Sequence, residues 1–358
     1  MSDRLDAILA EAVPTVCPAA VAVIAVDGAV VAAAAAGELV RYADAAFTLA
    51  GDRPPATRGS VFDLASISKL FTTAAILSLT EEGALSLDEP VAAWLPGPDR
   101  RITLRRLLTH TAGFQPTRRI DLELPDADAD ARLAAMIDTP VTGPIGGPYV
   151  YSDVGLVMAG RVAEAASGAS LDELVRTRVT GPLGLTATGY RPLPRDRAGE
   201  PPADPARVAA TEWKPERPGP GCVRGEVHDE TSYALGGVAG HAGVFGTADD
   251  VLALGEALRL GGAAALRPET VAEMLRDQGV TGAPFRHGLG VRLGDPGIVG
   301  PLHDAYGHSG FTGTSLVVSP SRRVTAVLLT NAVHPVRGRP GIRELRTAVA
   351  TEALRLAS

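Results

Sequence analysis

The chain has 358 residues, of which 46% are hydrophobic, with 34 basic and 41 acidic residues and a formal net charge of −7. This length and apolar content are enough for one large domain or two interleaved ones with a real core. The basic residues are scattered, which excludes a typical nucleic-acid partner because such proteins carry a basic patch or stripe.

The N-terminal residues, Met-Ser-Asp-Arg-Leu-Asp, do not form a basic segment followed by an apolar one, so we expect no signal peptide. The longest apolar stretch, 19–36, is interrupted by Asp27-Gly28, so we expect no membrane span and no membrane partner. These features predict a cytoplasmic protein. Two cysteines, Cys17 and Cys222, are too few for a disulfide framework and are expected to be free thiols.

The predicted elements begin with an amphipathic helix at 3–13, followed by two β-rich runs whose Asp27-Gly28 junction predicts a tight hairpin. A long helix is expected to begin near Ser66 and to run through Leu79. The Pro- and Arg-rich stretch 191–222 predicts a long loop. Further helices are expected at 103–109, 130–138, 153–167, 170–178, 248–260, 268–277 and 341–357, and strands at 287–293, 315–320 and 323–331.

Both ends of the chain are therefore β-rich, and the middle is mostly helical. This order predicts an α/β (α+β) fold in which an antiparallel sheet is flanked by helices and carries an inserted, mostly helical lobe. We expect 1–65 and 245–358 to form one discontinuous α/β domain and 66–244 to form the helical lobe. The active site is then expected at their junction.

Lysine usage draws attention to one motif. Only Lys69 and Lys214 are lysines, and the other 34 − 2 = 32 basic residues are arginines. Arginine stays protonated, whereas a buried lysine can lose its proton, so a surviving lysine is a candidate for proton chemistry. Lys69 follows Ser66 by three residues at a predicted helix start, so both side chains share one face. A serine hydroxyl needs such a base to become a nucleophile, although Ser-x-x-Lys can also arise by chance.

Two more segments could carry chemistry. Tyr151 lies just before a predicted helix, where it could shuttle a proton between nucleophile and leaving group; alternatively, Ser152 or Asp153 simply caps the helix. Residues 307–315 read Gly-His-Ser-Gly-Phe-Thr-Gly-Thr-Ser, and their glycines allow a ligand to approach the backbone. A histidine beside glycine is more often structural, but the small hydroxyl residues around His308 favour a site.

The order Ser-x-x-Lys, Tyr-x-Asp, His-Ser-Gly resembles the serine β-lactamase, penicillin-binding-protein and esterase family. Similar linking segments lie at 61–66, 102–113, 236–250 and 329–331, and the resemblance extends from about residue 15 to 350. It implies the β-lactamase/transpeptidase-like fold and a serine hydrolase that cleaves a carboxylic ester or amide through an acyl-serine intermediate.

The resemblance also implies roles for individual residues. Ser66 would attack the carbonyl, and Lys69, alone or with Tyr151, would take its proton. The oxyanion would lie between the backbone N–H groups of Ser66 and Phe311. The residues expected to bind substrate are Asp153, His308, Ser309, Gly310 and His241.

Two positions depart from the family pattern. Asp153 stands where the family usually has asparagine, and an ionised carboxylate facing the cleft would raise the pKa of Lys69. His308 stands where β-lactamases and transpeptidases usually have lysine, and a mostly neutral imidazole binds a substrate carboxylate weakly at pH 7. Esterase-like members resemble this chain in having histidine there. Both departures reduce the expectation of efficient β-lactam or D-Ala-D-Ala chemistry.

Alternatives stay open at this point. The same acyl-enzyme could pass its acyl group to an alcohol or amine in an acyltransferase, or the fold could serve as a non-catalytic ligand-binding module. His228, Asp229 and His241 could be drawn as metal ligands, but nothing at Ser66 requires a metal. We therefore expect no metal and no cofactor, and a small-molecule ester, amide or peptide as partner. His110 is expected to be structural.

Overall fold

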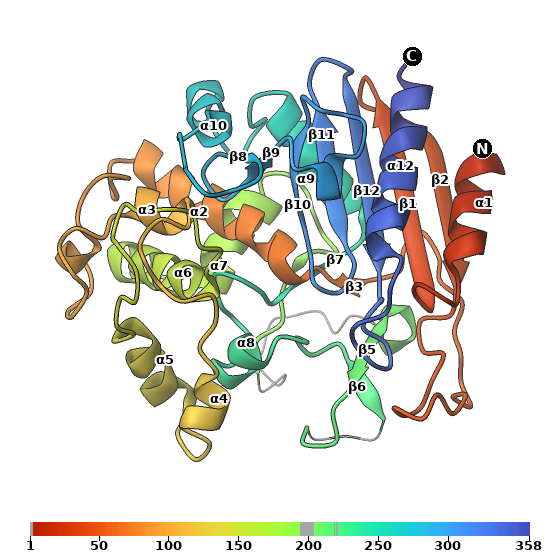
Figure 1. The fold of residues 1–358 in the computed structure, drawn as a ribbon, viewed down its shortest axis with the longest axis horizontal. Helices are drawn as coiled ribbons and strands as arrows, with labels where there is room; N and C mark the ends of the chain where they lie inside the picture. The colour runs from red at the N-terminus through yellow and green to blue at the C-terminus, as the bar shows by residue number, and fades with distance from the viewer. Residues whose placement is uncertain (1–2, 194–203, 218, 220) are drawn as a thin grey trace.

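A seven-stranded antiparallel sheet, built from both ends of the chain, forms the centre of the molecule (Figure 1). The computed structural model describes residues 3–193, 204–217, 219 and 221–358. The strand order is β2-β1-β12-β11-β10-β9-β8. The strands are β1 (Ala19–Val26), β2 (Ala29–Gly37), β8 (Arg286–His287), β9 (Arg292–Leu293), β10 (Tyr306–Ser309), β11 (Ser315–Ser319) and β12 (Val324–Thr330). The predicted antiparallel sheet and the predicted hairpin at Asp27-Gly28 are confirmed.

Strand β1 separates two cores because its side chains alternate between the faces of the sheet. Ala20, Ala22 and Ile24 belong to the core under α1 (Asp3–Ala12) and α12 (Ile342–Leu356). The alternate residues of β1 belong to the larger core, which contains α9 (Ala248–Arg259) and the helical lobe. Figure 1 shows α1 and α12 together against the sheet, away from that lobe.

Helix α2 (Ser68–Glu81) is the centre of the helical lobe (Figure 1). Every residue from Ser68 to Leu79 is buried, as expected of a helix that is enclosed on all sides. The remaining helical segments are η1 (Ala65–Ile67), η2 (Val91–Ala93), α3 (Leu104–Leu108), α4 (Ile120–Glu123), α5 (Ala129–Ile137), α6 (Asp153–Ser167), α7 (Leu171–Val175), η3 (Arg176–Thr180), η4 (Pro205–Arg207), α8 (Glu230–Ala234), α10 (Pro268–Leu275) and α11 (Pro296–Val299).

Two small sheets were not predicted. One has the order β3-β7-β4 and consists of β3 (Phe62–Asp63), β7 (Val244–Gly246) and β4 (Gly189–Tyr190); the other pairs β5 (Ala210–Trp213) with β6 (Cys222–Arg224). The prediction of one long loop over 191–222 is therefore wrong at β5, while 194–203, 218 and 220 lie outside the described residues. The expected domain boundaries fall beside β3 and at β7, and the division into two domains stays a prediction.

The strand expected at 287–293 is also wrong, because two short strands, β8 and β9, pair there as a hairpin. Gly290 has φ +62° between them, and a Cβ at this position would lie 2.1 Å from Thr73 Oγ1. The chain therefore turns at a position where only glycine fits against α2. Both cysteines are free, as predicted. No helix in the described ranges is long and apolar enough to cross a membrane.

Candidate active site

Ser66 lies on η1, at the turn between β3 and α2. The preceding residue, Ala65, has φ +47°, a left-handed conformation that costs energy for a residue other than glycine. Asp63 holds this turn, because one carboxylate oxygen accepts from Ala65 N at 2.8 Å and the other accepts from His228 N at 2.7 Å. Burial raises the pKa of Asp63. Sequence reasoning did not single out Asp63, whose role depends on a contact with a segment far along the chain.

Lys69 is fully buried, and its ammonium group has three acceptors around it. Nζ lies 2.9 Å from Ser66 Oγ, 3.2 Å from the carbonyl oxygen of His241 and 2.8 Å from Asp153 Oδ1. A charged lysine has three N–H donors and no lone pair, so two hydrogen bonds and an ion pair with a carboxylate suit the protonated form. The geometry therefore favours an ammonium at this position.

The electrostatics of Lys69 agree with its geometry. Burial opposes the charge, but the Asp153 carboxylate and the Tyr151 phenol outweigh it and raise the pKa of Lys69 above its usual value. We expected an Asp153 carboxylate that faces the cleft to raise the pKa of Lys69, and in the structure this carboxylate does pair with the lysine. A lysine held in this way is charged at neutral pH, and a charged lysine cannot accept the proton of Ser66.

Tyr151 approaches Ser66 from the other side of the hydroxyl. Its phenol donates a hydrogen bond of 3.0 Å to Ser66 Oγ, and its ring lies 4.8 Å from Lys69 Nζ and 5.0 Å from the guanidinium carbon of Arg292. The next residue, Ser152, caps α6 by accepting from Gly155 N at 3.3 Å. The capping interpretation and the interpretation of Tyr151 as a site residue are therefore compatible.

His110 fixes the segment that carries Tyr151. Its Nδ1 accepts from Ser152 N at 3.0 Å, and its ring centre lies 4.7 Å from that of Tyr151. Burial, with the nearby His287, lowers the pKa of His110 well below its usual value, so the imidazole is neutral. His110 is structural, as expected, since its lone pair serves the backbone.

His308 lies on β10, where its ring centre is 6.3 Å from that of Tyr151. Its Nδ1–H donates to the carbonyl of Ser309 at 2.9 Å, and its buried Nε2 has no hydrogen-bond partner. Burial, Arg292 and Lys69 lower its pKa well below the usual value. His308 is therefore neutral, and it cannot supply the positive charge that the family usually has from lysine at this position.

The loop after β10 packs directly against the residues that precede Ser66. A Cβ at Gly310 would lie 2.6 Å from the carbonyl oxygen of Leu64, so only glycine fits there. Thr312 Oγ1 donates to the carbonyl of Asp63 at 2.8 Å, and Thr314 Oγ1 donates to that of Leu64 at 3.1 Å. The same loop carries the backbone N–H of Phe311, whose side chain is exposed.

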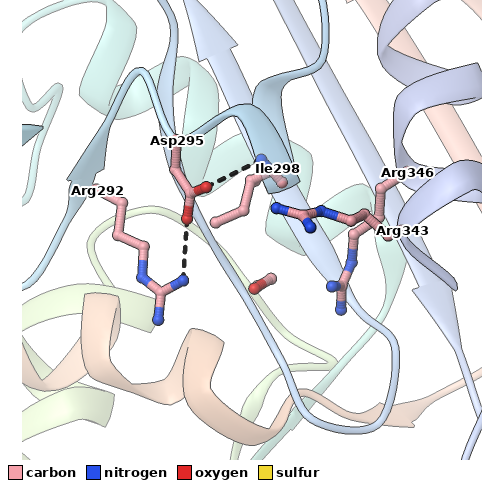
Figure 2. A pocket seen from close by; sticks show the side chains of 7 residues that line it. Arg292, Asp295, Ile298, Arg343 and Arg346 are labelled. Atoms are coloured by element: carbon pink, nitrogen blue, oxygen red, sulfur yellow. Dashed lines mark hydrogen bonds and ion pairs between the residues drawn. The ribbon is translucent and has the colours of Figure 1, made fainter. Parts of the chain in front are cut away.

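A pocket of about 210 Å³ begins beside Ser309. Figure 2 shows three arginines that extend into it, Arg292 from β9 and Arg343 and Arg346 from α12. Arg292 Nη1 lies 3.0 Å from Asp295 Oδ2, the one carboxylate of the lining. Three guanidinium groups against one carboxylate give the pocket a net positive charge. Sequence reasoning missed it because no local motif connects these arginines.

The side chains of His228, Asp229 and His241 do not converge on one point. His241 Nε2 pairs with Asp229 Oδ1 at 2.8 Å, whereas His228 Nε2 pairs with Glu212 Oε2 at 3.0 Å. His241 is buried, and it meets the site through its backbone carbonyl, which accepts from Lys69, rather than through the imidazole expected to contact substrate. Over the described part of the chain, no group of three or more His, Cys, Asp or Glu side chains could hold a metal ion.

A serine hydroxyl that receives hydrogen bonds from a lysine and a tyrosine, between an antiparallel sheet and a helical lobe, defines a serine hydrolase of the β-lactamase and penicillin-binding-protein fold. The family model described as Beta-lactamase matches residues 9–351. The chain belongs to this family, which confirms the resemblance, the fold class and the enzyme class predicted from the sequence.

Individual relatives agree with this assignment. A protein of Escherichia coli (strain K12) named "Putative D-alanyl-D-alanine carboxypeptidase" is 33% identical over 315 residues, which cover 78% of this chain and 70% of that protein. The solved structure of EstCE1, described as a hydrolase with promiscuous acyltransferase activity, is 27% identical with a TM-score of 0.72 and covers 97% of both chains. The structure of SurE is 25% identical with a TM-score of 0.72, and covers 98% of this chain and 76% of that one.

Proposed function

We propose that this chain cleaves a carboxylic ester or amide through a covalent acyl-serine on Ser66. The observation that carries the proposal is the pair of hydrogen bonds on Ser66 Oγ, 2.9 Å from Lys69 Nζ and 3.0 Å from the Tyr151 phenol. A serine becomes a useful nucleophile when a proton acceptor lies within hydrogen-bond reach. The acyl group then leaves in a second step, in which water attacks the ester on Ser66.

We assign the moving proton to Tyr151 rather than to Lys69. The three acceptors around Lys69 favour its charged form, which has no lone pair for the proton of Ser66. Tyr151 can take this proton only as a phenolate, which becomes a neutral phenol when Ser66 gives up its proton. Lys69 and Arg292 lie 4.8 Å and 5.0 Å from the Tyr151 ring, and these two cations stabilise the negative charge of the phenolate before the transfer. The same phenol would return the proton to the leaving group and later assist the attacking water.

The oxyanion of the tetrahedral intermediate would accept from the backbone N–H groups of Ser66 and Phe311. The packing of Gly310 and Thr314 against Leu64 supports this assignment, since it holds the loop of Phe311 beside the serine turn. Donors that are fixed in advance cost no reorganisation when charge develops, and one of them is worth about 3 kcal/mol of transition-state stabilisation.

The arginine pocket supports a leaving group that carries an anion, such as a terminal carboxylate. His308 is neutral, so the charge that would select such a group has to come from elsewhere, and Arg292, Arg343 and Arg346 supply it beside Ser309. Guanidinium groups bind carboxylates through parallel hydrogen bonds. The relative named as a carboxypeptidase is consistent with substrates of this class. Asp153 acts in this proposal on Lys69 rather than on substrate.

The first test is release of p-nitrophenol from p-nitrophenyl butyrate by the wild type and by Ser66→Ala. We expect turnover in the wild type, its loss in the variant, and a butyryl adduct on the wild type by mass spectrometry after an acid quench. Equal rates in the two proteins would contradict the proposal.

The leaving-group assignment has its own matched pair of substrates, the butyrate esters of 3-hydroxybenzoate and 3-hydroxybenzamide. Both have the same acyl group and similar shape, but only the first is anionic. We expect kcat/KM to be about tenfold higher for the carboxylate, the size of one charge-assisted hydrogen bond. Equal kcat/KM values for the two esters would contradict the proposal of an anionic leaving group, but they would not affect the proposal of an acyl-serine intermediate.

Acyl transfer is a second candidate activity, which the likeness to EstCE1 supports. The two activities differ only in whether water or another nucleophile takes the acyl group from Ser66. Product analysis of the p-nitrophenyl butyrate reaction with added methanol separates them. If the fraction of product that is methyl butyrate exceeds the molar fraction of methanol in the solvent, the chain prefers methanol to water and belongs with the acyltransferases.

A further inference from the structure

Arg346 connects the C-terminal helix to the loop that follows β10. Its Nη2 donates to the carbonyl oxygen of Gly310 at 2.8 Å and to that of Thr314 at 3.1 Å. These two carbonyls belong to the ends of one tight loop, since Gly310 N also donates to Thr314 O at 2.8 Å. One guanidinium group therefore holds both ends of the loop from the side of α12.

The charge on Arg346 persists in this environment. Burial and the neighbouring Arg292 lower the pKa of Arg346 to about 10, and Asp295 opposes them. The group stays protonated at neutral pH, and its buried Nε has no hydrogen-bond partner. A cation kept in a poorly solvated position exerts a stronger field on its neighbours than one in water.

The carbonyl of Gly310 and the N–H of Phe311 are the two ends of the same peptide group. A hydrogen bond from a cation to the oxygen draws electron density toward that oxygen, which makes the N–H at the other end a stronger donor. The same bond fixes the plane of the peptide and hence the direction of the N–H. Gly313 N donates to the carbonyl of Gly310 as well, at 3.0 Å, so this oxygen has two donors.

We propose that Arg346 is a positioning residue for the oxyanion hole, which orients and polarises the Gly310–Phe311 peptide so that the Phe311 N–H is aimed and strengthened as a donor. The inference rests on the proposed function, in which that N–H binds the oxyanion. It is distinct from anion binding in the arginine pocket, because it acts on every substrate, including those with no charge.

The test compares Arg346→Gln, Arg346→Lys and Arg355→Gln on p-nitrophenyl butyrate, which has no anionic group for the pocket. Arg355 is the matched control, because it lies on the same helix and its side chain is 50% exposed. It pairs with Glu352, and Glu352 keeps its ion pair with Arg4 when Arg355 is replaced. We expect Arg346→Gln to lower kcat about tenfold with KM unchanged, a smaller loss than removal of a donor itself. Arg346→Lys should recover part of kcat, and Arg355→Gln should match the wild type.

A second measurement observes the peptide itself. The sequence has two Gly-Phe pairs, at Gly113-Phe114 and Gly310-Phe311, so ¹³C-carbonyl glycine with ¹⁵N-phenylalanine labelling gives two NMR amide signals. We expect Arg346→Gln to move the Phe311 amide proton upfield and to leave Phe114, the internal reference, in place.

The two measurements separate the possible failures. An unmoved Phe311 signal, or an effect of Arg346→Gln on KM alone, would overturn the role of Arg346. Turnover that does not depend on Ser66, together with a shifted Phe311 signal, would refute the proposed function and leave the polarised peptide standing.

Discussion

The two regions that adjoin Ser66 differ in how they treat charge. On one side, Lys69 is fully buried and its charge is balanced by Asp153 at 2.8 Å. On the other side, beyond His308, three arginines share one carboxylate around a pocket of about 210 Å³. The first region is closed and nearly neutral overall, whereas the second is open and positive.

In the function that we propose, this difference corresponds to two different tasks. A charge that is balanced and enclosed can organise proton transfer without attracting ions from solvent. An excess of charge around an open pocket attracts an anionic group and holds it by hydrogen bonds. The buried imidazoles of His110, His287 and His308 have lowered pKa values, so they add no positive charge beside these cations.

The largest effect should come from the closed region. Replacement of Lys69 by Met removes the ammonium that contacts Ser66 and leaves Asp153 without its partner. We expect kcat for p-nitrophenyl butyrate to fall about a thousandfold, within the range for groups that organise proton transfer. Circular dichroism should confirm that the variant is folded. A folded variant that keeps a tenth of the wild-type kcat would mean that the closed region is not needed for chemistry.

A charge reversal in the open region should have a smaller and more selective effect. Arg343→Glu places a carboxylate in the pocket, so we expect the preference for the 3-hydroxybenzoate ester over the 3-hydroxybenzamide ester to fall about tenfold. The measurement is the ratio of kcat/KM for the two esters. If the ratio is unchanged, the pocket does not receive the leaving group, and the contrast between the two regions has no catalytic meaning.

Asp153→Asn tests the balance of charge inside the closed region. The Asp153 carboxylate helps to raise the pKa of Lys69, so its removal lowers that pKa and the ammonium loses its proton at lower pH. If Lys69 acts in its charged form, the alkaline limb of the pH–kcat profile moves about one unit toward neutral pH. A rise in kcat at neutral pH, with the acid limb moving instead, would restore Lys69 as the general base.

The smallest expected effect is on stability, and it comes from the buried, neutral imidazole of His287. Burial lowers the pKa of His287 to about 4, from 6.5. The unfolded chain therefore takes up the proton first, so stability is present above pH 6.5 and is lost as pH falls toward 4. We expect His287 to lower the free energy of unfolding by about 1 kcal/mol between pH 7.5 and pH 5.8.

Urea unfolding at the two pH values measures this effect, and His287→Gln provides the comparison. Between the two pH values, the free energy of unfolding should fall by about 1 kcal/mol less in the variant than in the wild type. An identical dependence in the variant would show that His287 is not held neutral by the fold.

The closed region could be predicted from the sequence to a large extent. Ser66 and Lys69 share one helix face because of their spacing, and the order of the three motifs added Tyr151 and His308. Lysine usage alone was less specific, because the other lysine, Lys214, has the same rarity and forms a buried ion pair with Glu230. The sequence alone could not predict the charge of Lys69, because that charge depends on whether the Asp153 side chain faces the lysine.

The open region could not be predicted in this way. Arg292, Arg343 and Arg346 are three of 32 arginines, and they have no common motif. They meet because β9 pairs with β10 and Arg346 of α12 reaches the loop that follows β10, and this neighbourhood is a property of the tertiary fold. The short strands around Gly290 escaped prediction for a related reason, since it is the contact with Thr73 that requires glycine at the turn.

The sheet order has a consequence for biosynthesis. Strand β1 pairs with β12, which is synthesised about 300 residues later, so β1 has no partner on that side until β12 has left the ribosome. Ser66 leaves the ribosome well before the loop at 310–314 and the guanidinium of Arg346 that holds it. A nascent chain therefore carries the serine without the parts that would stabilise the oxyanion. The proposed oxyanion hole is therefore complete only after α12 has docked and Arg346 has reached the loop.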